Sequence, residues 1–434
     1  MDLPLRSRLA RQTARLVARG LKVVPRFRGE TLPGRIALRV DPDFLNHARE
    51  MSLSQARTIL VTGTNGKTTT TAFARSLLGP AVVSNRGSNL PWGIASVLAQ
   101  RPRAAAYAVF EVDEAYVPSV ADSLQPSVLV WLNMSRDQLD RSLEVRRLAT
   151  RVGEASSSVA TLVANASDPL IVANATQFRE CVWVRGPVEW QGDAQACPRC
   201  TGELVHAETW SCASCGLSEP VAAYEVDEAG RLWHDGVVLG HIHPGLPGNF
   251  NLLNALMACV GVALVQHEPV EMVAARLQRS SGVEGRFATW WLTGCEGTPA
   301  LVTYLAKNPA GWHANLSMID TEASELVLGL NARIADGRDT SWIFDVEFER
   351  LVRTPVIVTG ERATDLALRL EVAGFEVVTV EPAQTLAIRL AAQRAAINGH
   401  SRIVYLGNYT AFQSLIASRT ELGAVVALTG EAAS

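Results

Sequence analysis

The stretch that most constrains this chain is residues 59–71, ILVTGTNGKTTTT, where a short apolar run leads into a glycine-containing loop with one lysine. Gly63 and Gly66 let the backbone turn so that several N–H groups point toward one anion. The pattern predicts a strand, a phosphate-binding loop and a helix whose N-terminus faces the phosphates, in preference to an ordinary strand-to-helix turn. The residues expected to hold a nucleotide here are Gly63, Thr64, Asn65, Gly66, Lys67, Thr68 and Thr69.

Lysine is rare in this chain, which supports a special role for the one in the loop. The sequence contains three lysines, Lys22, Lys67 and Lys307, and arginine carries nearly all other positive charge. A lysine retained at Lys67 indicates a need for a compact ammonium group, here for the β- and γ-phosphates of a nucleotide. Thr68 offers the neighbouring hydroxyl for Mg²⁺.

Length and composition narrow the class of protein. A chain of 434 residues is long enough for two or three domains. The formal charge of −3 and the pI near 6.3 argue against a general nucleic-acid binder. We identify no run of about 18 or more uncharged apolar residues, so we expect no membrane span. Seven cysteines, four of them in CxxC pairs, favour metal binding in a reducing cytoplasm over a disulfide scaffold.

Residues 1–40 form a basic segment in which leucines and arginines alternate. The segment lacks the long apolar core and cleavage site of a secretory signal. Two interpretations remain open. We favour a helix packed on the next domain with a solvated arginine face, and the alternative is a helix that contacts anionic lipid at the inner face of the membrane.

Residues 41–297 are expected to form the nucleotide-binding domain. Short apolar runs alternate with helical segments, which predicts a parallel sheet with helices on both faces. Glu111 ends a buried strand, where a carboxylate beside a phosphate loop commonly holds Mg²⁺. A solvated strand end is the alternative for Glu111, and it is a stronger alternative for Asp113 and Glu114.

Two further groups in this domain are candidates for nucleotide contact. Asn251 and Asn254 lie three residues apart near the start of a helix, so their amides share one face and can grip a base or ribose. Arg286, in GVEGRF, is a candidate for phosphate or carboxylate contact, and an ordinary surface arginine is an equal alternative.

Residues 190–222 differ in character from the rest of the domain. Cys197, Cys200, Cys212 and Cys215 form two CxxC pairs with turn residues between them. Four thiolates at this spacing can close a tetrahedral Zn²⁺ site with no open coordination position. The pattern predicts a structural zinc ribbon inserted into the domain, with a redox pair as the minor alternative.

Residues 298–434 are expected to form a second, smaller α/β domain of Rossmann-like type. Lys307, in KNPAG, follows its first strand and is a candidate for cofactor contact. Polar residues then gather in the loop NARIADGRDTSWIFD, where turn formation and helix capping readily explain Asp336 and Asp339. Asp345, one turn into the expected helix, is less easily explained in this way, although a carboxylate that stabilises the helix dipole stays an alternative.

Several of these segments, in this order, resemble the Mur ligase family: VTGTNGKTTT, the strand ending in Glu111, NMSRDQLDR, GNFNLLN, GVEGRF and KNPAG. The four-cysteine ribbon and the ADGRDTSWIFD loop more narrowly resemble the MurT branch, the ligase-like subunits of lipid II isoglutaminyl synthase. The resemblance covers about residues 40–420. It implies ATP and Mg²⁺ as cofactors, with Asp345 at the position of a catalytic aspartate.

The departures from the wider family favour amidation over amino-acid addition. Gln138 stands where a histidine is common, and residues 141–163 contain no lysine that could be carbamylated. The acidic residue that often precedes KNPAG is absent as well. We also expect no room before residue 41 for the domain with which typical family members hold a UDP-sugar.

The resemblance therefore implies that the α-carboxylate of D-glutamate in the lipid II stem peptide is phosphorylated by ATP and amidated by ammonia to D-isoglutamine. It also implies a partner that supplies ammonia, a GatD-like class I glutamine amidotransferase subunit docked on the carboxyl-terminal domain. Two alternatives stay open: an amino-acid ligase of the Mur or folylpolyglutamate type, and a non-catalytic nucleotide-binding scaffold.

Overall fold

The computed structural model describes most of the chain and divides it into two compact units. The first comprises residues 1–135, 144–244 and 249–279, and the second residues 136–143, 245–248 and 280–434. The described residues are 4–23, 31–85, 87–100, 105–136, 144–187, 195–277, 287–292, 299–319, 324–350 and 354–426.

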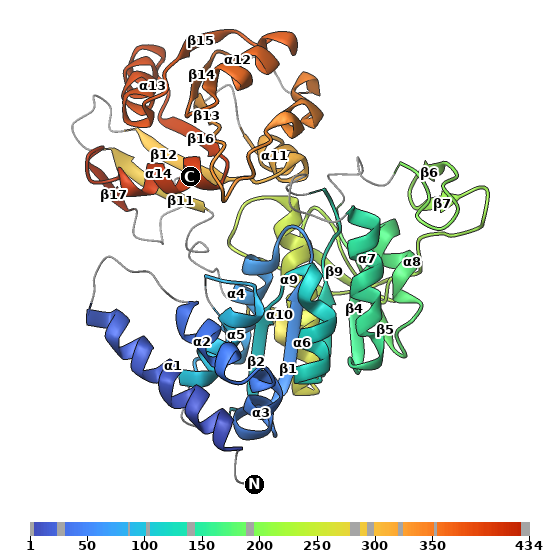
Figure 1. The fold of residues 1–434 in the computed structure, drawn as a ribbon. Coiled ribbons are helices and arrows are strands. Elements are labelled where there is room, and N and C mark those ends of the chain that lie inside the picture. The colour runs from blue at the N-terminus through green and yellow to red at the C-terminus, as the bar shows by residue number, and fades with distance from the viewer. Residues whose placement is uncertain are drawn as a thin grey trace. The chain divides into compact units, whose positions relative to one another are not determined.

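The first unit is built on an eight-stranded sheet in the order β10-β9-β8-β5-β4-β3-β1-β2 (Figure 1). The six strands from β8 to β2 run parallel, and β9 and β10 are antiparallel additions. The strands are β1 (Arg57–Thr62), β2 (Tyr107–Glu111), β3 (Val128–Trp131), β4 (Thr161–Asn165), β5 (Cys181–Arg185), β8 (Tyr224–Val226), β9 (Arg231–His234) and β10 (Val237–His241). The central strands are apolar and buried along almost their whole length, as strands covered on both faces must be.

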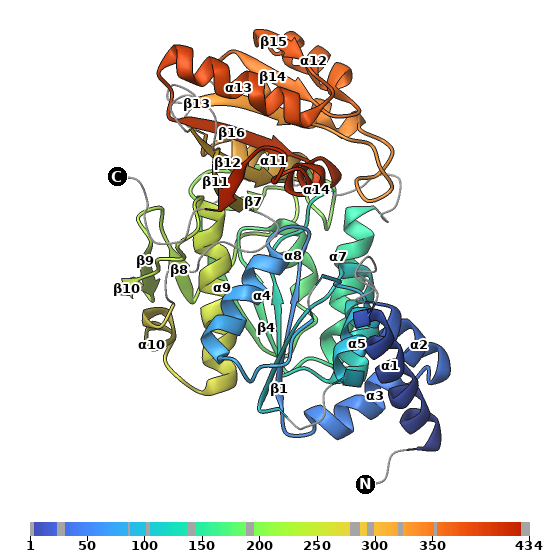
Figure 2. The same cartoon turned by 90° about the vertical axis from the view of Figure 1, so that its left-hand side faces the viewer.

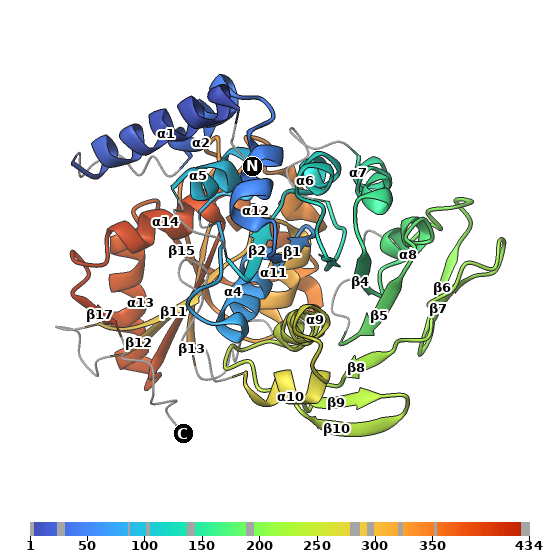
Figure 3. The same ribbon diagram turned by 90° about the horizontal axis from the view of Figure 1, so that it is seen from below.

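Helices cover both faces of this sheet, which confirms the expected α/β class. Figure 3 shows α4 and α9 on one side of β1 and α6 and α7 on the other. The helices of the sheet layers are α4 (Lys67–Leu78), α5 (Pro91–Gln100), α6 (Val117–Leu124), α7 (Val145–Gly153), α8 (Pro169–Ala175), α9 (Asn249–Gln266) and α10 (Val270–Ala275).

The helix α9 carries no charged residue, although asparagines and a glutamine interrupt its apolar sequence. Among the described helices it is the one that could cross a membrane by length and composition. However, 67% of it is buried within the protein, where it packs on α4, β1 and β3. It is the apolar core helix of this unit.

The four-cysteine segment forms a small antiparallel ribbon, as expected. Its strands are β6 (Leu204–His206) and β7 (Trp210–Cys212), which lie in the chain between β5 and β8. Its buried residues Leu204, Trp210 and Leu217 form one hydrophobic cluster with Val172 of α8. The ribbon is therefore an insertion into the first unit.

The second unit contains a seven-stranded sheet in the order β15-β14-β13-β16-β12-β11-β17 (Figure 2). The five strands from β15 to β12 run parallel, and β11 is antiparallel to both of its neighbours. β11 precedes residue 298, where we expected this domain to begin. The elements are β11 (Phe287–Leu292), β12 (Ala300–Leu305), α11 (Pro309–Leu316), β13 (Ser324–Gly329), β14 (Val356–Thr359), α12 (Ala363–Val372), β15 (Val377–Val380), α13 (Gln384–Asn398), β16 (Arg402–Gly407), α14 (Tyr409–Ala417) and β17 (Ala424–Val426).

Three helices precede β1: α1 (Leu5–Val23), α2 (Leu32–Val40) and α3 (Phe44–Ala48). α2 packs against both α1 and α5. The contact between α2 and α5 depends on Gly34, because a Cβ atom there would collide with the backbone of Trp92 and Ser96. Gly20, in α1, has open space around it.

These two glycines give a matched pair of stability predictions. Gly34→Ala should destabilise the first unit by about 1–3 kcal/mol, because α2 must move away from α5. Gly20→Ala should instead stabilise α1 by about 0.5–1 kcal/mol, since alanine favours the helix at an open position. Urea unfolding followed by circular dichroism measures both changes. An equal change in the free energy of unfolding of the two variants would contradict the close packing at Gly34.

Candidate active site

The loop between β1 and α4 has the backbone conformation that its glycines suggest. Gly63 and Gly66 have φ angles of +132° and +85°, which side-chain-bearing residues rarely adopt. A Cβ atom on Gly66 would also lie 2.5 Å from Oδ1 of Asn254, at the start of α9. Two separate constraints, conformation and space, therefore require glycine at this position.

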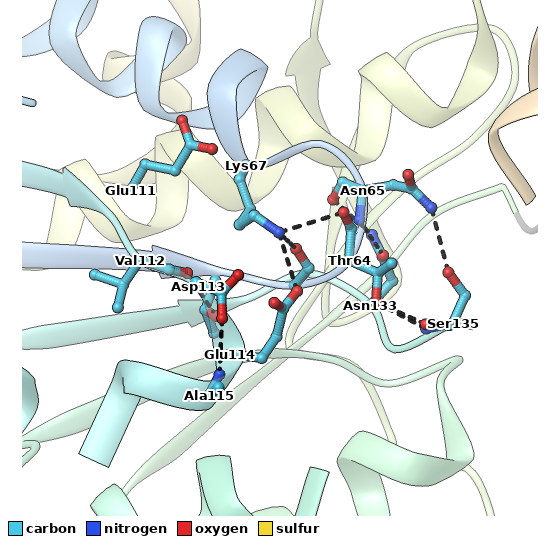
Figure 4. A network of polar contacts seen from close by, with 12 residues as sticks. Thr64, Asn65, Lys67, Glu111, Val112, Asp113, Glu114, Ala115, Asn133 and Ser135 are labelled. Atoms are coloured by element: carbon cyan, nitrogen blue, oxygen red, sulfur yellow. Dashed lines mark hydrogen bonds and ion pairs between the residues drawn. The ribbon is translucent and has the colours of Figure 1, made fainter. Parts of the chain in front are cut away.

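The loop is fixed from one side by the segment after β3 (Figure 4). The backbone N–H of Asn65 donates to Oδ1 of Asn133 at 2.9 Å, and Nδ2 of Asn133 donates back to the Asn65 carbonyl at 3.0 Å. The hydroxyl of Thr64 bonds to the carbonyl and N–H of Ser135 at 3.1 and 3.0 Å. The side chains of Thr64 and Asn133 thus hold the loop in shape, and they do so partly through the backbone of Asn65.

Lys67 is the first residue of α4 and is 7% exposed. Its Nζ donates to the carbonyl of Gly63 at 2.5 Å and to Oε1 of Glu114 at 3.0 Å (Figure 4). Burial lowers the pKa of Lys67, but the charges of Glu114, Glu111 and Asp113 outweigh burial and raise it. The ammonium is therefore kept protonated at the point where phosphates would bind.

Glu114, for which a solvated strand end was an alternative, turns into the protein instead. It is not a solvated strand end, because it is 8% exposed and forms the buried ion pair with Lys67. The pattern of apolar residues marks the end of β2 but gives no sign of which following acid turns inward. Asp113, in contrast, accepts the backbone N–H of Ala115 and so begins a short 3₁₀ turn.

Glu111 lies beside Thr68, as a shared Mg²⁺ site requires. The Thr68 hydroxyl donates to Oε2 of Glu111 at 3.0 Å. The backbone of Glu111 is held in turn by Asn85, which pairs with its N–H and carbonyl at 2.9 and 2.8 Å. These hard oxygen donors, next to a phosphate loop, are of the kind that Mg²⁺ binds.

The asparagine pair of α9 also reaches the loop. Asn251 and Asn254 are both buried, with their amides 3.4 Å apart, and Asn254 lies against Gly66. Thr69 is buried in the first turn of α4. Arg286 lies outside the described residues.

The four cysteines of the ribbon come together as the spacing predicts. Their sulfur atoms all lie within 4.8 Å of one another, with Cys197 and Cys215 at 3.6 Å and Cys200 and Cys212 at 3.5 Å. Although burial raises the pKa of Cys212, N–H groups of Cys215 and Ser214 and the other thiols lower it to about 6. The cluster can therefore present thiolate to a metal ion.

The three aspartates of the polar loop at residues 331–345 differ in their contacts. Asp336 is buried and accepts from the N–H groups of Thr410 and Arg333, and Asp339 accepts the N–H of Ser341. Both therefore have structural roles, as expected. The helix that follows is a single 3₁₀ turn, Ser341–Asp345.

Asp345 and Lys307 remain as functional candidates in this unit. Asp345 has a side chain that is 41% exposed, and its Oδ2 lies 3.2 Å from the guanidinium of Arg136, which also belongs to the second unit. Lys307 follows β12, and its Nζ lies 5.2 Å from the centre of the Tyr409 ring.

Comparison with known proteins agrees with this architecture. Residues 61–190 match the Mur ligase middle domain and residues 305–412 match the MurT ligase C-terminal domain. The fold is similar to that of a pseudomurein peptide ligase type C from Methanothermus fervidus, with a TM-score of 0.65 at 20% identity, over 84% of this chain and 79% of that one.

Two curated relatives are similar over nearly their whole length. Both are named lipid II isoglutaminyl synthase (glutamine-hydrolysing) subunit MurT. The one from Streptococcus pneumoniae is 30% identical over 90% of this chain and 93% of its own length. The one from Staphylococcus aureus strain COL is 30% identical over 86% and 87%. With its phosphate loop, its cysteine ribbon and both domain matches, the chain belongs to the MurT family of Mur-type ligases.

Proposed function

We propose that this protein catalyses the ATP-dependent amidation of the α-carboxylate of D-glutamate in lipid II, giving D-isoglutamine. The observation that carries the proposal is the buried Lys67 ammonium in a phosphate loop of a MurT-family chain. The direct test is incubation of the protein with detergent-dispersed lipid II, ATP, Mg²⁺ and ammonium, followed by mass spectrometry of the stem peptide. A product that still carries the carboxylate, even with a glutaminase subunit present, would contradict the proposal.

The residues of the first unit fit ATP and Mg²⁺. Backbone N–H groups of the loop and the N-terminus of α4 would meet the phosphates, with Lys67 neutralising the charge that develops on the transferred group. Thr68 and Glu111 would hold Mg²⁺, which would supply positive charge to the phosphates. The substrate carboxylate would attack the γ-phosphorus and release ADP, leaving an acyl phosphate.

Asp345 is the residue that we propose for the second half of the reaction. The nitrogen of ammonia would attack the acyl carbon, phosphate would leave, and a proton would pass from the nitrogen to a base. A carboxylate suits this step because it accepts hydrogen bonds from ammonia and then the proton. Asp345 is half-exposed, and Arg136 contacts only one of its oxygens among the ion pairs of the described residues.

We further propose that ammonia comes from a GatD-like glutaminase subunit. A glutaminase nucleophile must be a reactive thiolate. Of the described cysteines, four form the metal-type cluster, and burial raises the pKa of both Cys181 and Cys259 to about 12. Exposed apolar side chains on the second unit, such as Leu386 and Ile397 of α13, offer this partner a surface.

For the cysteine cluster we propose Zn²⁺. Four sulfurs around tetrahedral zinc, at about 2.3 Å from the ion, lie about 3.8 Å apart. The cluster spacings of 3.5 and 3.6 Å, with all four atoms within 4.8 Å, fit that geometry. Since four protein ligands leave no open position, the ion would stabilise the ribbon and take no part in the reaction.

Removal of both members of the buried ion pair tests the phosphate loop. The double variant Lys67→Met/Glu114→Gln should keep the fold, because no unpaired charge remains buried. Amidation should fall by about 100-fold or more, because the phosphates lose their ammonium partner. The matched control is Glu114→Gln alone, in which Lys67 keeps its bonds to the carbonyls of Gly63 and Thr64 and the nearby charge of Glu111, and which should retain turnover. Undiminished amidation by the double variant would show that the loop does not act on phosphate.

Asp345 and Asp339, the two exposed aspartates of the loop in the second unit, give a matched test of which residue accepts the proton from ammonia. Asp345→Asn should abolish amidation while ATP binding, measured by calorimetry, stays unchanged. Asp339→Asn should remain active, because an amide oxygen can still accept the N–H of Ser341. Loss of activity in the Asp339 variant alone would move the role to that residue.

Metal analysis tests the ribbon. The purified protein should contain about one zinc ion per chain, as four-cysteine sites do. Cys212→Ser should lose the metal and lower the thermal stability of the ribbon, whereas Cys181→Ser, outside the cluster, should change neither. Mass spectrometry of the intact protein measures the number of zinc ions bound to each chain. An unchanged zinc content in Cys212→Ser would contradict the assignment.

A further inference from the structure

The outer face of α1 carries leucines that the protein leaves in solvent. Leu5, Leu9 and Leu16 are 74%, 49% and 66% exposed. At 3.6 residues per turn, these three positions fall within about 40° of one another around the helix. They therefore form one apolar stripe along the helix, interrupted by the exposed Gln12 between Leu9 and Leu16. We call this the leucine stripe.

The opposite face of α1 fixes the helix to the first unit. Ser7, Ala10 and Ala14 are fully buried there. The Ser7 hydroxyl donates to Oδ2 of Asp41 at 2.5 Å, and His47 Nδ1 lies 2.8 Å from the same hydroxyl and 2.9 Å from Asp41. Figure 3 shows α1 at the edge of its unit, outside α2. The leucine stripe is thus held outward by the packing.

Two arginine contacts add to this anchoring. Nε of Arg6 donates to the carbonyl of Val40 at 2.6 Å, and Nε of Arg15 donates to the carbonyl of Ala99 at 2.9 Å. Rotation of α1 that would bury the leucine stripe would break these bonds together with the Ser7 contacts. The exposure of the leucines is a property of the folded unit.

The charge around the leucine stripe is of one sign. The 19 residues of α1 include five arginines and one lysine and no acidic residue. Arg8 and Arg19 are exposed and lie on one flank of the leucine stripe, and Arg6 lies on the other. Arg35 and Arg39, both exposed, add positive charge from the adjacent helix α2.

We propose that α1 lies flat on an anionic phospholipid surface, with the leucine stripe inserted among the acyl chains and the flanking arginines at the lipid phosphates. An amphipathic helix with a narrow apolar face and a strongly basic polar face binds membranes in this way. The packing of α1 on its unit agrees with the interpretation that we favoured from the sequence, and the proposal adds the lipid contact that was the alternative. The inference does not depend on the proposed reaction, although a lipid-linked substrate would be presented at the same surface.

A comparison with α13 shows why the basic residues of α1 favour a membrane over a protein as its binding partner. Leu386, Leu390 and Ile397 of α13 are exposed with the same spacing as the leucine stripe. Yet α13 has only two arginines, and these bond to Glu325 and to the carbonyl of Glu421. The apolar stripe of α13 suits a protein, whereas that of α1, bordered by basic side chains, suits anionic lipid.

The two helices provide a matched test in which the full-length protein is sedimented with lipid vesicles. Wild-type protein should co-sediment with vesicles of phosphatidylcholine containing about one third phosphatidylglycerol, and not with phosphatidylcholine alone. Leu5→Glu/Leu16→Glu should lower the bound-to-free ratio by about tenfold or more, since two leucines lose their insertion. Leu386→Glu/Ile397→Glu, with the same spacing on α13, should bind as wild type. High salt should weaken wild-type binding.

Three outcomes would overturn the proposal: no wild-type binding to the anionic vesicles, undiminished binding by the α1 variant, or an equal loss in the α13 variant. A fourth would identify a different occupant. If wild-type protein ignores vesicles but the α1 variant fails to capture the glutaminase subunit, the leucine stripe belongs to a protein interface. Thermal unfolding of both variants should match wild type, because all four substituted side chains are exposed.

Discussion

The Lys67 ammonium, buried at the start of α4, is the interaction around which the first unit is arranged. A buried charge must be matched by other charges and dipoles, since burial alone would drive off its proton. The match comes from the neighbouring strands: β2 leads to Glu111 and Glu114, and β3 leads to Asn133 and Ser135, which hold the loop itself. The order β3-β1-β2 puts both strand ends beside the loop, at the carboxyl edge where parallel sheets bind ligands.

The ion pair between Lys67 and Glu114 also bears on why a chain so rich in arginine keeps lysine here. The ammonium fits among the carbonyls of Gly63 and Thr64 and one carboxylate oxygen, all within 3.3 Å. A planar guanidinium presents its donors in a fixed fork and has no equivalent arrangement of three converging bonds. The site is thus selective for a small cation before any nucleotide binds.

The second unit uses its acidic loop in a different way. Two of the three aspartates are occupied with backbone N–H groups, so they shape the loop, and Asp345 alone among them pairs with a side-chain cation. The same division appears in α1, where one face supplies structure through Ser7 and the alanines and the other leaves the leucine stripe in solvent. In both places the residues that lack a structural task are the ones we propose to act on a ligand or a surface.

Much of the fold and part of the site could be read from the sequence because they depend on neighbours in the chain. Apolar runs predicted the parallel strands, Gly63 to Thr68 predicted the phosphate loop, and two CxxC pairs predicted the ribbon. Each of these is encoded within a few residues or in one repeated spacing. The assignment of Glu111 to the neighbourhood of Thr68 followed from the same reasoning about strand ends.

Which residues from distant segments of the chain contact one another was determined by the tertiary structure alone. The inward turn of Glu114 to Lys67, the contact of Asn254 with Gly66 and the hold of Asn133 on Asn65 all depend on which strands and helices lie side by side. The periodicity of α1 showed that it is amphipathic, but only the packing of Ser7 and Ala10 determined that the leucines face outward. Local patterns encode periodicity and turn chemistry, whereas the direction of a buried side chain is set by what packs against it.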